Sequence, residues 1–128
     1  MGANLAAQAT GRHAEPFETA EQAWFWTMAA LRARHDGAAR RSGAARPRPC
    51  DPDDVIRCLD RLYRRRRIDL AHAQALRVWG ERQTAPSERH RDAALWREAL
   101  DRLDWVLRSK GIVSGERIYS LTQLGVAA

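Results

Sequence analysis

Four helix-capping signals divide this chain, and they constrain its fold more than any other feature of the sequence. Thr19 and Gln22 have the spacing of a capping box, Asp51 stands directly before a proline, Asp69 opens a third segment and Ser87 a fourth. Apolar residues at helical spacing follow each signal. The sequence therefore predicts four main helices, and a chain of 128 residues is expected to pack them around one core.

The first helix, expected over 19–35, is apolar on two sides. Trp24, Met28 and Leu31 share one face, whereas Trp26 projects from the opposite side together with several alanines. Two apolar faces need two partners. The helix is therefore either sandwiched within the core of its own chain, or it offers one face to another protein or to a second copy in a homodimer.

Composition predicts four regions along the chain. Residues 1–16 show no periodicity and are expected to form a disordered tail, and residues 17–36 form the N-terminal helix. Residues 37–50 contain two Gly-Ala-Ala-Arg copies and two prolines, which is typical of a flexible basic connector. The third region ends where the second capping signal begins, so residues 51–125 form the main domain.

The formal net charge of +6 is concentrated in one part of the chain. Residues 37–67 contain ten arginines against four aspartates, and the remainder is balanced. Clustered positive charge predicts an anionic partner, with nucleic acid first. The connector is either an ordinary solvated linker or an arm that follows phosphates. The arginines assigned to a DNA backbone are Arg40, Arg41, Arg46, Arg48, Arg57, Arg61, Arg64, Arg65, Arg66 and Arg67.

The end of the chain combines a helix with a predicted hairpin. Residues 112–114 and 117–121 are expected to form two short strands around Gly115 and Glu116, after a helix that ends near Lys110. The motif residues are Leu103, Leu107, Lys110-Gly111-Ile112-Val113, Tyr119-Ser120-Leu121-Thr122 and Gly125. Their order resembles the end of a winged helix-turn-helix domain. The resemblance covers residues 51–125 and implies a mostly α fold with four main helices and a short C-terminal β-hairpin.

This resemblance also implies which residues face DNA. By analogy, 51–67 is the first helix of the domain, 69–80 the second, and 88–110 contains the recognition helix. The sequence leaves open whether this last stretch is one continuous helix from Ser87 to Lys110 or breaks near Asp92. The expected groove contacts come from its early part and from the wing: Arg89, His90, Arg91, Arg97, Arg102 and Arg117. The function expected is that of a transcription regulator that binds double-stranded DNA. The outer face of the last helix is nevertheless charge-balanced, because it pairs Glu98 with Arg102 and Asp104 with Arg108 at i, i+4 spacing.

The aromatic residues favour a second hypothesis. Trp24, Trp26 and Trp105 are the expected partner-binding residues of an adaptor, since tryptophan is enriched at contact centres. Trp105 points away from its helix's apolar stripe, and the C-terminal tail is expected to cover it.

The whole chain is also similar to small regulators of phage-like and gene-transfer-agent clusters, some of which act on RNA polymerase as antiterminators. That similarity is carried by Phe17-Glu18-Thr19-Ala20, Trp24-Phe25-Trp26, Cys50-Asp51-Pro52-Asp53-Asp54 and Leu62-Tyr63-Arg64-Arg65. A third hypothesis is RNA binding through the arginines alone.

Several classes of function are not expected from this sequence. Its four histidines and two cysteines lack the spacing of a catalytic or zinc motif, so no enzyme activity, metal or cofactor is predicted. Lys110 is the only lysine and no glycine-rich turn precedes it, which excludes a phosphate-binding loop. Neither a membrane span nor a targeting segment is recognisable, and reduced thiols fit a cytoplasmic protein.

Overall fold

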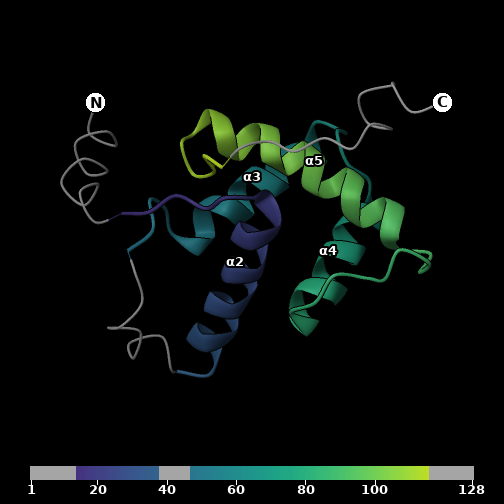
Figure 1. Cartoon of the computed structure of the whole chain (residues 1–128), viewed down its shortest axis with the longest axis horizontal. Helices are drawn as coiled ribbons and strands as arrows, with labels where there is room; N and C mark the ends of the chain where they lie inside the picture. Colours follow the sequence, from purple (N-terminus) through teal and green to yellow (C-terminus); the bar gives the residue numbers. More distant parts are fainter. Residues whose placement is uncertain (1–13, 38–46, 116–128) are drawn as a thin grey trace.

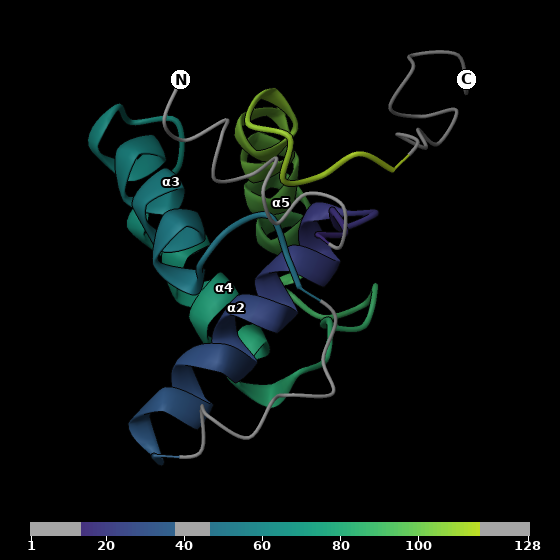
Figure 2. The same cartoon turned by 90° about the vertical axis from the view of Figure 1, so that its left-hand side faces the viewer.

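The computed structural model describes residues 14–37 and 47–115, and this part of the chain is built from four helices (Figure 1). They are α2 (Ala20–His35), α3 (Pro52–Arg64), α4 (Leu70–Arg82) and α5 (Ala93–Ser109). The expected helical class is confirmed. α2 and α4 lie side by side beneath α5, and α2 crosses the middle of the molecule obliquely, where it contacts each of the other three helices (Figure 2).

Three of the four predicted helix starts are confirmed by their cap contacts. The Thr19 hydroxyl accepts a hydrogen bond from the backbone N–H of Gln22 at 3.0 Å. At the start of α3, the backbone N–H of Asp51 donates to the Asp54 carboxylate at 2.8 Å. The N–H of Asp69 donates to Nδ1 of His72 at 2.9 Å. The Thr19 side chain thus satisfies a donor of the first turn of α2, whereas Asp54 and His72 satisfy the N–H groups of the residues that cap α3 and α4.

The fourth predicted start, at Ser87, is wrong, because α5 begins at Ala93. Residues 87–92 form turns in which the Ser87 carbonyl accepts from the N–H of His90 and the His90 carbonyl accepts from that of Ala93. Asp92 ends this segment and is fixed from outside, since its carboxylate accepts a hydrogen bond from the indole N–H of Trp79 at 2.9 Å. A contact between two elements, and not local capping, therefore sets the start of α5.

The polypeptide that follows α5 pairs with the segment that precedes α2. The backbone N–H of Phe17 donates to Ile112 at 2.8 Å, and the N–H of Ser114 donates to Phe17 at 2.9 Å, which forms an isolated parallel bridge. Within residues 14–37 and 47–115 this bridge is the only β pairing. The predicted hairpin needs residues 117–121, which lie outside the described residues.

Residues 14–16 were expected to belong to a disordered tail, but Glu15 and Pro16 form hydrogen bonds with the segment that precedes α3. The backbone N–H of Glu15 donates to the carbonyl of Pro47 at 2.9 Å. Arg48 also donates to the Glu15 carbonyl at 2.9 Å and lies 4.3 Å from the centre of the Phe17 ring. Both ends of the described chain are thereby attached to the helical core.

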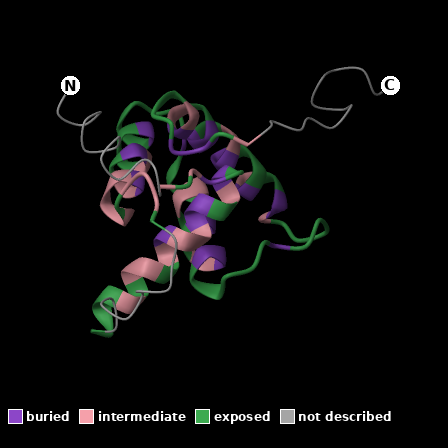
Figure 3. Ribbon diagram, turned by 60° about the vertical axis from the view of Figure 1, so that its left-hand side comes forward, coloured by how far each residue is buried: buried purple, intermediate pink, exposed green. Residues whose placement is uncertain are grey.

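Buried residues gather where the four helices meet, whereas the last turns of α2 carry intermediate and exposed residues (Figure 3). Each helix contributes large apolar side chains to this core, among them Trp24, Val55, Leu76, Leu103 and Leu107. The N-terminal helix is thus part of the same core as the helices after residue 51. Its second face is also covered within the chain at Trp26, whose ring lies 5.1 Å from that of Phe17.

α4 approaches α2 closely at Gly80. A Cβ atom there would stand 2.6 Å from Nε1 of Trp24 and 2.8 Å from Cγ of Met28. The sequence predicted that α4 ends at Gly80, but the helix continues to Arg82 and ends with Gln83 at a φ of 57°. Gly80 is therefore required for helix packing and not for the helix end.

None of the four helices in the described ranges has the length and apolar sequence needed to cross a lipid bilayer.

We expect the substitution Gly80→Ala to lower the free energy of unfolding by about 1 to 3 kcal/mol, because the added methyl group forces Trp24 or Met28 to move and this outweighs the better helix propensity of alanine. Urea unfolding followed by circular dichroism measures the change. The matched control is Gln74→Ala, at an exposed position of the same helix, which should stay within about 0.5 kcal/mol of the parent. Equal stability of both variants would contradict the close packing of α2 on α4.

Candidate nucleic-acid interface

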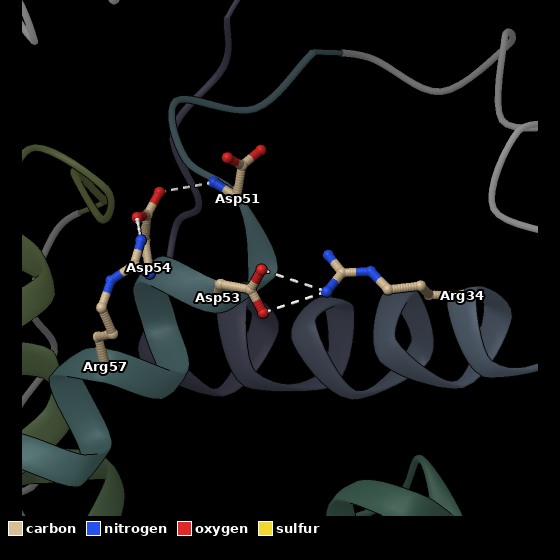
Figure 4. Close-up of polar contacts among 5 residues, drawn as sticks. All are labelled: Arg34, Asp51, Asp53, Asp54 and Arg57. Carbon is tan, nitrogen blue, oxygen red and sulfur yellow. Dashed lines mark hydrogen bonds and ion pairs between the residues drawn. The ribbon is translucent and has the colours of Figure 1, made fainter.

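The acidic side chains near the start of α3 form ion pairs with an arginine of α2 and with an arginine of α3 itself. Arg34 of α2 contacts both carboxylate oxygens of Asp53, at 3.1 and 3.2 Å, and Arg57 pairs with Asp54 (Figure 4). Arg64, the last residue of the helix, pairs at 3.0 Å with Asp60 one turn earlier. Arg57 and Arg64 were both assigned to the DNA backbone, and in this structure they have acidic partners.

Arg61 of α3 and two arginines that follow the helix face α5 across a groove. Arg61 and Arg65 stand one turn apart on the same side of the helix, and Arg67 follows from the turn after it. From the opposite wall, α5 contributes Arg102 and Trp105. We call this feature the arginine groove; it has a volume of about 490 Å³ and is lined by Cys58, Arg61, Leu62, Arg65, Arg67, Arg102, Trp105 and Val106.

Charge of a single sign distinguishes the arginine groove. Four arginines line it, and no lining residue is acidic. Within the described ranges, Arg61, Arg65 and Arg67 form no ion pair, and Arg102 contacts only the neighbouring Asp101, at 3.3 Å. Guanidinium groups stay protonated at any pH a protein experiences, so the groove carries a fixed positive field that attracts phosphates.

The floor of the groove is apolar, whereas its rim holds an exposed aromatic ring. Leu62 and Cys58 are buried at the base, and Val106 is partly buried. Trp105 is 65% exposed, the largest exposure of any big apolar side chain in the described residues. The C-terminal tail that was expected to cover Trp105 lies beyond residue 115 for the most part and so outside the described residues, and the indole lines the groove.

A larger hollow, of about 840 Å³, lies between the ends of α2 and α4. It is lined by Arg32 and His35 but also by Asp36 and Glu81, so its charges offset one another. The arginine groove is the better candidate for an anionic ligand, because recognition of phosphate depends on the sign of the field and not on the volume of a cavity.

The end of α3 carries an arginine in a conformation that disfavours side chains. Arg66 has a φ of 59°, in the left-handed region. The N–H groups of Arg66 and Arg67 donate to the carbonyls of Tyr63 and Leu62, which is the Schellman pattern that glycine usually completes. The expected helix over 51–67 thus stops at Arg64, and the last three arginines form its cap. An arginine at a left-handed position is a local exception of the kind that occurs at functional sites.

The remaining backbone candidates divide between the core and the part of the chain that is not described. Arg48 packs on Phe17 and donates to the carbonyls of Glu15 and Pro16, so it stabilises the fold. Arg40, Arg41 and Arg46 lie outside the described residues, as does Arg117 of the predicted wing.

The expected groove-reading residues do not share one helix. Arg89, His90 and Arg91 lie in the turns before α5, where His90 packs edge-on against Trp79 at 4.8 Å. Arg97 is exposed on α5. The predicted pair of Glu98 with Arg102 is replaced by another, since Glu98 accepts from Nε2 of His72 at 2.9 Å. Arg102 is consequently part of the arginine groove.

The three partner-binding candidates have different environments. Trp24 is 2% exposed and donates its indole N–H to the Leu76 carbonyl at 2.8 Å, so it is a core residue and is not accessible to a partner. Trp26 is half-buried on Phe17. Trp105 alone of the three is exposed, and it lies beside arginines. Sequence reasoning separated Trp105 from Arg102, although their i, i+3 spacing outside the apolar stripe was a signal that they share a face.

Both thiols are held in the protonated form. Burial, reinforced by Asp54 and Asp51, raises the pKa of Cys50 to about 12. Burial also raises the pKa of Cys58 at the floor of the groove. Across residues 14–37 and 47–115, histidine, cysteine and acidic side chains form no cluster of three or more that could hold a metal ion.

Comparisons of the chain with protein-family models, with curated proteins and with solved structures found no match.

We expect Arg66→Gly to raise the free energy of unfolding by about 0.5 to 1 kcal/mol, because relief of the left-handed strain exceeds the entropic cost of glycine. Arg66→Ala is the matched control, since it removes the same guanidinium but keeps Cβ and the strain. Thermal unfolding compares the two variants. A glycine variant no more stable than the alanine variant would show that the cap is not strained.

We expect native Cys50 to react slowly with iodoacetamide, because only the thiolate attacks. At pH 9 a thiol with a pKa of about 12 is roughly one thousandth ionised, against about half for one with its ordinary value. Alkylation should therefore accelerate as the pH rises from 9 to 12, and the same protein in urea should react fast at pH 9. Mass spectrometry measures both rates. Equal rates with and without urea would contradict the raised pKa.

Proposed function

We propose that this protein binds nucleic acid through the arginine groove and that it is a transcription regulator acting on double-stranded DNA. One observation carries the proposal: four arginines, from α3, the turn after it and α5, converge on a groove whose lining includes no acidic side chain. Arginine contacts phosphate oxygens through several N–H groups at once, and such contacts supply most of the affinity of proteins for DNA. No bond is made or broken in this function, and no cofactor is needed.

The order of elements supports a winged-helix form of this proposal. Helices α3, α4 and α5 follow one another and lead into the extended residues 112–114, as in the resemblance described above. The connection between α4 and α5 spans residues 83–92, whereas the turn of a helix-turn-helix has about three or four residues. Arg89 and Arg91 would therefore reach bases from a loop, and Arg97 from the exposed side of α5.

A second candidate function is that of a protein-binding adaptor, with RNA polymerase as one partner. The exposure of Trp105 next to Arg102 favours it, since tryptophan and arginine are the side chains most enriched at the centres of protein contacts. Trp24 and Trp26 add less to this hypothesis than the sequence predicted, because the core and Phe17 cover them. The observed charge favours nucleic acid.

The proposal is tested by two triple variants with the same loss of charge. The first replaces Arg61, Arg65 and Arg67 with glutamine, and the second replaces Arg34, Arg57 and Arg64, which have acidic partners. Fluorescence anisotropy with a labelled 20-base-pair duplex measures affinity between 50 and 200 mM salt. Each lost phosphate contact lowers the slope of log K against log salt by about 0.9. We therefore expect the first variant to lose about two to three units of slope, and the second less than one.

Two results would contradict this proposal. Equal losses in the two variants would mean that net charge, and not the groove, holds the duplex. A parent protein whose affinity does not change with salt would exclude phosphate binding altogether and favour the adaptor. Thermal unfolding of both variants verifies that they fold, which we expect because exposed ion pairs contribute only about 0.2 to 1 kcal/mol each.

A further inference from the structure

The position of Trp105 suggests a more specific ligand for the arginine groove than duplex DNA. Its large aromatic ring is 65% exposed and stands in a groove whose other exposed side chains are guanidinium groups. An aromatic ring among cations suits a ligand that is both flat and anionic. A nucleotide has this combination, because its base has an apolar face and its backbone carries phosphates.

The face of a base is accessible only when the base is unpaired. In a duplex each base is stacked between its neighbours, and a side chain reaches just its edges from a groove. Proteins that bind single strands combine a positively charged channel with aromatic side chains on which bases stack. The arginine groove has both features.

We infer that the arginine groove binds an unpaired nucleotide whose base stacks on Trp105 and whose flanking phosphates contact Arg61, Arg65 and Arg67. The inference rests on the proposed nucleic-acid function and specifies the ligand of the same site. The two walls would bind different parts of the nucleotide. α5 presents the indole to the base, with Arg102 one turn before it. α3 and the turn after it present the three other arginines to the phosphates.

The apolar floor of the groove fits this arrangement. Leu62 and Cys58 are buried there, and burial raises the pKa of the Cys58 thiol, so the floor is uncharged. A base on Trp105 would thus have an apolar surface beneath it and cations at its rim. The unpaired nucleotide comes either from a melted DNA strand or from RNA, which present the same chemistry to the indole.

The test compares strands that differ only in their bases. A labelled (dT)12 strand and a 12-residue abasic strand have the same phosphates, so arginine contacts alone give equal affinities. We expect the parent protein to bind (dT)12 about 5- to 100-fold more tightly than the abasic strand, which is the contribution of one to a few stacked bases. Binding of (dT)12, but not of the abasic strand, should also quench tryptophan emission.

Two variants assign the preference to Trp105. Trp105→Leu should bind both strands with the affinity that the parent has for the abasic strand, and Trp105→Phe should keep part of the preference because a phenyl ring still stacks. Trp105 is mostly outside the core, so both variants should unfold at the temperature of the parent. A (U)12 strand identifies the source: tighter binding than (dT)12 indicates RNA, and weaker binding indicates a DNA strand, both of which support the inference.

Three results would overturn it. Equal binding of (dT)12 and the abasic strand, together with salt-sensitive duplex binding, would refute stacking while the proposed function stands. A preference for (dT)12 that survives in Trp105→Leu would place the base elsewhere. Polyglutamate that competes as well as (dT)12 would show a groove for acidic protein segments. By contrast, a protein that binds neither the duplex nor any strand would refute the proposed function itself.

Discussion

The contact of Trp24 with α4 determines how the rest of this molecule is assembled. Its indole fills the space that Gly80 leaves open, and its N–H donates to the carbonyl of Leu76. Because the hydrogen bond and the missing side chain act on the same ring, they fix both the separation of α2 from α4 and their register. α2 also contacts the other two helices, through Arg34 on Asp53 of α3 and through Glu21, which accepts from the Trp96 indole of α5 at 2.9 Å. Both walls of the arginine groove therefore pack against a helix that does not line it.

The sequence predicted those features of the fold that depend on neighbouring residues. The starts at Thr19, Asp51 and Asp69 could be recognised because a cap is a contact within one turn of helix. Boundaries that depend on another element could not be recognised. The start of α5 depends on a hydrogen bond from Trp79, and a glycine that ends a helix looks the same in sequence as Gly80, which admits a neighbouring ring.

The same distinction applies to the candidate site. Clustered arginines indicated a region of the chain. Arg57 and Arg64 were assigned to the DNA backbone, although their spacings from Asp54 and Asp60 were a signal that they are neutralised. That Arg102 and Trp105 face Arg61 could not be predicted, because it depends on how α3 packs on α5. Helical periodicity placed Trp24 correctly on an apolar face, yet a buried face and a binding face have the same pattern until the packing is known.

A groove charged by arginine alone also limits how the protein can be controlled. Histidine or lysine would let acidity or acetylation alter the field, but a guanidinium neither loses its proton nor accepts an acetyl group under ordinary conditions. The Cys58 thiol at the floor of the groove is kept neutral by burial and adds no charge of its own. Binding of the proposed nucleic acid would consequently respond to ionic strength and to competing anions, and not to pH or acetylation.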